Sequence, residues 1–170
     1  MRLSGLLVFA LLAVAGCAAG QPNIYVMRHL QKAEGADPPL SELGRSNARL
    51  LPDLVRRHPP RAIYVSTTRR ARETAAPLAE ALGITPQEYD PRDTPALLAR
   101  LNAERRTVLV VGHSNTVPDI VEGVGGRRPD PIDEATYGWI YYIYGQDRRR
   151  ILIRVDVNCI PVDAEDQGRC

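Results

Sequence analysis

The sequence predicts an α/β fold, built as a three-layer sandwich with a mostly parallel central sheet, helices on both faces and a C-terminal antiparallel hairpin. Short apolar runs typical of strands alternate with segments of helical periodicity along most of the chain. Such alternation is typical of a parallel sheet covered by helices on both faces. Near the C-terminus, two strand-like runs flank Gly145-Gln146-Asp147, a sequence typical of a hairpin turn.

Six strands are predicted. The clearest is Thr107–Val111, because it is a continuous and mostly β-branched apolar run, as expected for a strand buried on both faces. The other five are Ile24–Met27, Ala62–Ser66, Gln87–Tyr89, Trp139–Tyr144 and Ile151–Val157.

Four helices are predicted from apolar residues at helical spacing, over residues 41–57, 69–82, 95–104 and 117–124. Ser41 is a plausible N-cap for the first helix, in which Pro52 predicts a kink or a division into two short helices. Gly83 ends the second helix, and Pro77 weakens its middle. Pro118 lies in the first turn of the last helix, where proline is tolerated.

The first residues predict a targeting segment. Met1-Arg2 is a basic start, residues 3–15 are almost wholly apolar, and small residues precede Cys17. This order is typical of a secretory signal, and the apolar run is shorter than the roughly 20 residues of a transmembrane helix. A cysteine directly after small residues resembles the lipobox of bacterial lipoproteins, which implies cleavage before Cys17 and lipid on its thiol. The alternative is an ordinary signal peptide cut at Ala18 or Ala19.

The lipoprotein interpretation divides the chain into a signal peptide at 1–16, a lipidated tether at 17–22, a folded domain at 23–158 and a tail at 159–170. Cleavage removes 16 of the 170 residues and leaves 154, which suits one domain with one core. We expect an exported bacterial envelope protein that is lipid-anchored to a membrane and faces the periplasm or the outside. An oxidising compartment allows Cys159 and Cys170 to form a disulfide.

The charge balance argues against a nucleic-acid partner. Without Arg2 the chain has 21 Lys and Arg residues against 20 Asp and Glu residues. Nucleic-acid-binding domains usually show a strong basic excess. The cluster Arg148-Arg149-Arg150 is therefore interpreted as a solvated turn.

The residues that carry chemistry are predicted at the ends of three strands. Arg28-His29 follows the first strand, Ser66 leads from the second strand to Arg69-Arg70, and Gly112-His113 ends the fourth. In an open α/β sheet, ligands bind beyond the carboxyl ends of the strands. Two imidazoles and two or three guanidiniums at this edge would form a pocket for a dianion, because the planar guanidinium matches phosphate oxygens.

A cationic pocket also favours the neutral form of its histidines, because neighbouring positive charge lowers the imidazole pKa. A neutral imidazole held in line with phosphorus is a competent nucleophile. The sequence therefore predicts phosphoryl transfer through a phosphohistidine, with no metal and no other cofactor.

Four motifs in order resemble the histidine phosphatase superfamily, whose fold is that of phosphoglycerate mutase. Arg28-His29-Leu30 resembles the Arg-His-Gly signature, and residues 40–45 resemble the Leu-Thr-x-x-Gly stretch of the first helix. Residues 66–75 resemble the Ser-x-x-x-Arg-Ala-x-x-Thr-Ala segment, and residues 110–113 resemble the strand that ends in the second histidine. The resemblance covers nearly all of the mature chain and implies a small single-domain member.

The resemblance implies a role for each matched residue. His29 would be the nucleophile that becomes phosphorylated. Arg28, Arg70 and His113 would hold the phosphoryl oxygens and stabilise the charge of the transition state.

The chain departs from the family at two points. Leu30 replaces the signature glycine, which predicts a less permissive loop and a more apolar pocket wall. The carboxyl group that protonates the leaving oxygen is not evident, and Asp93 is the candidate, with Asp90 in the same region and Asp119 after His113 as alternatives. Lys32 is a further candidate phosphate contact.

The predicted function is hydrolysis of a small phosphomonoester or phosphoramidate, and the absence of an inserted lid resembles the bacterial phosphohistidine phosphatase. Two alternatives remain open. One is an envelope domain of the same fold that binds a phosphorylated ligand with little or no turnover. The other is a serine hydrolase, because residues 112–116 resemble the nucleophile elbow. The fifth elbow position is threonine, however, and no histidine follows Ser114 in the chain.

Overall fold

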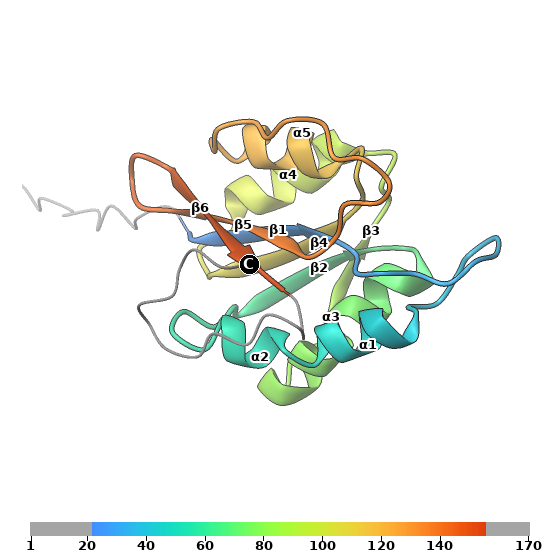
Figure 1. The fold of residues 1–170 in the computed structure, drawn as a ribbon. Coiled ribbons are helices and arrows are strands. Elements are labelled where there is room, and N and C mark those ends of the chain that lie inside the picture. Colours follow the sequence, from blue (N-terminus) through green and yellow to red (C-terminus); the bar gives the residue numbers. More distant parts are fainter. Residues whose placement is uncertain (1–21, 156–170) are drawn as a thin grey trace, which may run out of the picture.

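The computed structural model describes residues 22–155, which form a six-stranded sheet between two layers of helices (Figure 1). The strands are β1 Ile24–Arg28, β2 Ala62–Ser66, β3 Gln87–Tyr89, β4 Val108–Gly112, β5 Trp139–Tyr144 and β6 Arg149–Arg154. Their order across the sheet is β3-β2-β4-β1-β5-β6. The first four strands are parallel, and β5 and β6 are antiparallel to their neighbours, so the predicted fold class is confirmed.

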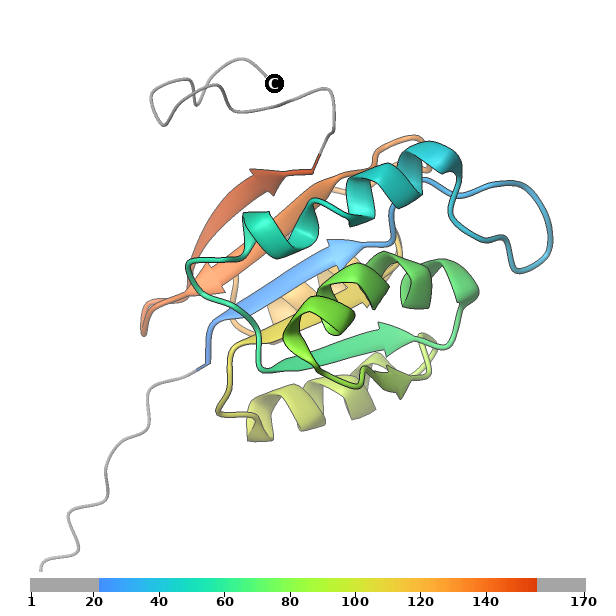
Figure 2. The same cartoon turned by 90° about the horizontal axis from the view of Figure 1, so that it is seen from below.

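Five helices cover the sheet. They are α1 Glu42–Ala48, α2 Leu51–Leu54, α3 Arg69–Leu82, α4 Thr94–Ala103 and α5 Val117–Gly123. Helices α4 and α5 lie on one face, and α1, α2 and α3 lie on the other, where Figure 2 shows them from below. No helix within residues 22–155 has the length and apolar character needed to cross a bilayer.

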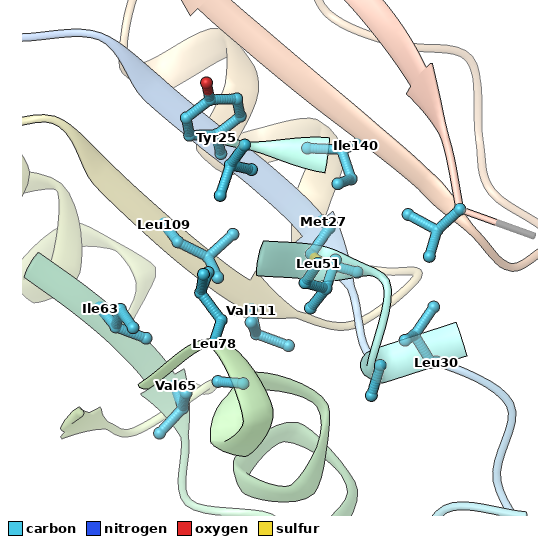
Figure 3. Packing of buried hydrophobic residues seen from close by; sticks show 14 of the residues in the cluster. Tyr25, Met27, Leu30, Leu51, Ile63, Val65, Leu78, Leu109, Val111 and Ile140 are labelled. Atoms are coloured by element: carbon cyan, nitrogen blue, oxygen red, sulfur yellow. The ribbon is translucent and has the colours of Figure 1, made fainter. Parts of the chain in front are cut away.

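The two-residue repeat of the strands divides the core into two clusters. Tyr25 and Met27 face α1, α2 and α3, where they pack with residues such as Leu51 and Leu78 (Figure 3). Ile24 and Val26 face the opposite layer, together with the apolar residues of α4 and α5. Because both faces of β1 are buried, its backbone is held rigidly, and the residues that follow it are placed accurately.

The predicted long helix over residues 41–57 is divided into α1 and α2. Ser41 caps α1 by accepting a hydrogen bond from the Gly44 N–H, as expected. Pro52 lies in the first turn of α2, where its missing N–H is tolerated, and α2 ends at Leu54, three residues before the predicted end. Pro77, by contrast, does not divide α3.

Strand β6 begins two residues earlier than predicted, at Arg149. The β5–β6 ladder extends to the pair Tyr144 and Arg149. Backbone hydrogen bonding to β5 therefore includes Arg149 and Arg150 in the strand, although arginine has no strong preference for strands. The signal segment, Cys17, Cys159 and Cys170 lie outside the described residues.

Candidate active site

Three parallel strands end side by side at one edge of the sheet. The register pairs Arg28 at the end of β1 with Gly112 at the end of β4, and β2 ends at Ser66 next to β4. The His29 N–H donates to the Gly112 carbonyl over 2.9 Å. The rings of His29 and His113 consequently lie 5.3 Å apart, centroid to centroid, in an edge-to-face arrangement. The structure thus brings the two predicted histidines together.

His29 is held in one orientation and one tautomer. Its side chain is buried, and Nδ1 lies 2.9 Å from the carbonyl oxygen of Leu30. A carbonyl only accepts, so the neutral ring carries its proton on Nδ1 and keeps the lone pair of Nε2 for attack. The Leu30 N–H in turn donates to the Thr74 hydroxyl over 3.0 Å, which fixes this loop to α3.

His113 lies between a hydroxyl and a guanidinium. Its Nε2 is 2.8 Å from the Ser66 hydroxyl, and its Nδ1 is 3.4 Å from an Arg70 Nη2. Because arginine only donates, Nδ1 accepts in this arrangement, and Nε2–H donates to Ser66. The Ser66 hydroxyl can also donate to Nε2. In that case the proton of His113 is on Nδ1, from which it can be donated to a ligand.

Arg28 is held from three sides by the loop of residues 133–137. Its Nη1 donates to the carbonyl oxygens of Asp133 and Thr136, at 2.8 and 2.9 Å. Its Nη2 donates to Glu134 at 2.8 Å and to the Tyr137 hydroxyl at 3.3 Å. The Tyr137 ring stacks on the guanidinium, with 4.1 Å between Cζ and the ring centroid. Both terminal nitrogens of the Arg28 guanidinium therefore already donate to this loop, and the Nε–H group is the donor that remains for a ligand.

Arg70 offers the same kind of donor. Its Nη1 lies 3.6 Å from an Asp37 carboxylate oxygen, and its Nη2 faces His113. The Nε atoms of Arg28 and Arg70 are buried, and among the described residues neither has a hydrogen-bond partner. A buried N–H without a partner is costly. These two donors are therefore well suited to an anion that binds beside His29.

Both histidines are expected to stay neutral at pH values at which an exposed histidine is protonated. Burial, reinforced by the nearby arginines, lowers the pKa of His29 from 6.5 to about 3 and that of His113 to about 4. The unfolded chain binds protons at these rings below about pH 6.5, whereas the folded chain does so only near the lowered pKa values. The folded state should therefore lose stability as the pH falls from about 6.5 towards 4 and below.

NMR titration of the imidazole ring protons measures the two pKa values directly, and urea unfolding over the same pH range measures the stability. A pKa near 6.5 for either His29 or His113 would contradict this picture of the site.

The structure adds residues that the sequence patterns did not single out. Glu134 accepts from Arg28, and it also accepts a short hydrogen bond from Ser114, directly after His113. Tyr137 lies over Arg28 and 5.9 Å from the His29 ring. Both belong to an irregular loop more than 100 residues from Arg28, and no local pattern marks them.

The predicted secondary candidates have other partners. Asp93 is the N-cap of α4 and accepts from the Ala96 N–H. Asp90 pairs with Arg92, and Asp119 pairs with Arg128. Lys32 is exposed and forms an isolated β-bridge with Leu40. No contact in residues 22–155 links any of these four side chains to His29 or His113.

The expectation for Leu30 is wrong. Its side chain is fully buried in the core cluster that contains Leu40 and Leu51, so it does not line the pocket (Figure 3). Arg148 is the only non-glycine residue with a positive φ in the described part of the chain, so the Leu30 backbone needs no glycine either.

The Ser114 contacts argue against the serine hydrolase alternative. The Ser114 hydroxyl donates to Glu134, while the adjacent His113 uses Nε2 for Ser66. A nucleophilic serine needs a histidine base within hydrogen-bond distance, and His113 is the last histidine in the sequence.

At this edge the α/β fold brings two buried imidazoles together with the guanidiniums of Arg28 and Arg70. The family model described as histidine phosphatase superfamily (branch 1) matches residues 24–92, which include Arg28, His29 and Arg70. Over these residues the chain is similar to the histidine phosphatase superfamily. No curated protein sequence matches the chain.

Solved structures share the fold. One is the protein histidine phosphatase SixA complexed with tungstate, with a TM-score of 0.58 and 19% identity over 77% of this chain and 94% of that chain. Another is a mycobacterial glucosyl-3-phosphoglycerate phosphatase with inorganic phosphate, with a TM-score of 0.58 and 17% identity over 80% and 97% of the two chains. At these identities the comparison supports the same fold.

Proposed function

We propose that the protein is a phosphatase that transfers the phosphoryl group of a small phosphorylated substrate to His29 and then to water. The observation that carries this proposal is the pair of buried guanidinium Nε–H groups, on Arg28 and Arg70, beside the neutral imidazole of His29. Neither Nε–H group has a hydrogen-bond partner within residues 22–155. The bound phosphate of one structural neighbour and the tungstate of another are consistent with an anion at this edge.

The proposed reaction has two steps. The Nε2 lone pair of His29 attacks phosphorus, and the bond from phosphorus to the leaving oxygen or nitrogen breaks. Water then attacks the phosphohistidine and regenerates the imidazole. The N–H groups of Arg28 and Arg70 stabilise charge on the phosphoryl oxygens in both transition states, and His113 donates to a third oxygen through Nδ1 once Ser66 donates to Nε2.

The test is a rate measurement with p-nitrophenyl phosphate and with a panel of metabolite phosphomonoesters and a phosphoramidate. Turnover should persist after dialysis against a chelator, because the proposed steps use only side chains of this chain. A protein that binds phosphate or vanadate without turning over any member of the panel would instead favour the ligand-binding alternative. That alternative has its own structural support, because the loop of residues 133–137 occupies most donors of Arg28.

Glu134 is the carboxylate that we assign to proton transfer in this reaction. The hydrogen bond from Ser114, together with the charge and the hydrogen bond of Arg28, lowers its pKa in the free protein. A dianion bound beside it disfavours a second negative charge and raises that pKa. Glu134 can then take up a proton, pass it to the leaving oxygen and later accept one from water.

Glu134→Gln is expected to lower kcat by about 10²-fold for alkyl phosphates, because general acid–base catalysis contributes on that order. The effect on p-nitrophenyl phosphate should be small, because that leaving group departs without a proton. Asp93→Asn is the matched control, since Asp93 caps α4, and it should leave both rates within about twofold. Equal losses on both substrates for Glu134→Gln would show that Glu134 only positions Arg28.

For the location, we propose that Cys17 carries lipid and anchors the protein to a membrane of the envelope. The basic start, the apolar run and the small residues before Cys17 support the proposal. Cys17→Ala should release the protein into the soluble envelope fraction, as measured by fractionation and immunoblotting. A variant that stays in the membrane fraction with its signal cleaved would contradict the lipid anchor.

A further inference from the structure

The edge of the sheet opposite the active site is rich in arginine. Arg61 precedes β2, Arg105 and Arg106 precede β4, and Arg148 and Arg149 lie at the turn between β5 and β6. The register places the start of β1 beside the starts of β4 and the end of β5, so all these positions lie at one end of the sheet (Figure 2). We call these five residues the arginine edge.

Three members of the arginine edge, Arg61, Arg105 and Arg106, are neighbours in the structure. The Arg61 N–H donates to the Thr107 carbonyl over 2.7 Å, and an Arg106 Nη1 lies 3.5 Å from the Arg61 carbonyl. Arg105 is adjacent in the chain and donates to the carbonyls of Asn102 and Glu104. The two strand starts therefore place three arginine residues next to one another.

Arg148 and Arg149 form the rest of the arginine edge. Arg148 lines a cavity of about 480 Å³ together with Arg105, so the two groups of arginines lie on either side of this cavity. Arg148 donates to the carbonyls of Val124 and Pro22, at 2.9 and 2.8 Å. Pro22 lies two residues before β1, so the Arg148 side chain contacts the backbone that leads into the first strand.

The arginine edge carries a net positive charge. Glu104 pairs with Arg106 and Asp147 pairs with Arg149. Among residues 22–155, Arg61, Arg105 and Arg148 form no ion pair with a carboxylate. Many of the acidic residues lie in the loops and helix starts of the opposite edge instead, namely Glu34, Asp37, Glu42, Asp90, Asp93, Asp119, Asp133 and Glu134. At that opposite edge carboxylates pair with arginines such as Arg45, Arg69 and Arg92, whereas the arginine edge keeps arginines that have no carboxylate partner in the described part of the chain.

We propose that the arginine edge rests on the anionic phospholipid surface of a membrane. Arginines near such a surface are attracted to it, and each raises the binding constant about fivefold. The six residues 17–22 span at most about 20 Å when extended, so a lipid at Cys17 would hold this edge, rather than the active-site edge, against the bilayer. His29 then faces the aqueous compartment. The proposal does not depend on phosphatase activity.

Vesicle co-sedimentation of the full chain carrying Cys17→Ser, which cannot take lipid at that position, tests the surface. Binding is measured with two kinds of vesicle, one of equal parts phosphatidylglycerol and phosphatidylcholine and one of pure phosphatidylcholine. The readout is the ratio of the first binding constant to the second. The contribution of the apolar N-terminal residues, which is the same for both vesicles, cancels in this ratio. The wild-type edge should give a ratio of about 10² or more, and added salt should lower it. A combined Arg61→Gln, Arg105→Gln and Arg149→Gln variant should lose about 10²-fold of this ratio.

The matched control changes the same charge at the other edge, with Arg45→Gln, Arg72→Gln and Arg92→Gln, and should keep the wild-type ratio. Thermal melting checks that both variants fold, and single substitutions at Arg61 and Arg105, each with about a fivefold loss, replace the combined variant if it does not. A wild-type ratio near unity, or an equal loss in the control, would overturn the proposal. Comparable affinity for double-stranded DNA would also overturn it, because it would mark a general polyanion surface.

Discussion

His29→Ala is expected to abolish phosphatase turnover while leaving the fold intact. The imidazole forms the bond to phosphorus, and no other described side chain offers a neutral nitrogen at that position. Its backbone N–H, which pairs with the Gly112 carbonyl, remains in the variant. The rate with p-nitrophenyl phosphate should fall to the level of the uncatalysed reaction, and circular dichroism and thermal melting should change little.

A trapping experiment identifies the intermediate. Rapid acid-free quenching with labelled substrate should place the label on His29, as a phosphoramidate that is stable to base and labile to acid. Ser114→Ala is the control, since this hydroxyl contacts Glu134 and should be dispensable for the covalent step. Full activity in His29→Ala, or a label on Ser114, would refute the phosphohistidine mechanism.

Arg70→Ala is expected to lower kcat by about 10²- to 10³-fold, because removal of one preorganised donor to a developing oxyanion costs that much. Arg70 is the better probe of transition-state charge than Arg28. Arg28 also links β1 to the loop of residues 133–137, so its removal would leave Glu134 and two carbonyl groups without their donor. For Arg70, the partners are the exposed carboxylate of Asp37 and the ring of the buried His113.

The neighbouring residue supplies the control for Arg70. Arg69 is exposed and pairs with Glu73 on the helix surface, so Arg69→Ala should keep kcat within about threefold. Inhibition by vanadate should weaken in parallel with kcat in Arg70→Ala and remain unchanged in Arg69→Ala. A parallel loss in both variants would show that total positive charge, rather than the Arg70 guanidinium, matters.

The elements whose composition matches their environment were predictable. Strands β2, β3 and β5 and helix α3 have the predicted bounds, because β-branched runs and small residues at helical spacing agree with the burial of those segments. The meeting of His29, Arg70 and His113 was also predictable, since parallel strands present their carboxyl ends at one edge. Leu30 was misjudged because its position in the chain says nothing about which way its side chain points.

The sequence by itself determined the order of strands and helices, the nucleophile candidate and the charged groups at the strand ends, because these follow from local periodicity and chain direction. Only the tertiary structure decided which donors remain for a ligand. Arg28 is joined to Glu134, 106 positions further along the chain, and this contact, with those to the neighbouring loop residues, leaves Nε as its available donor. Such a pairing depends on how an irregular loop packs across the edge of the sheet, and no short-range pattern of residues encodes that packing.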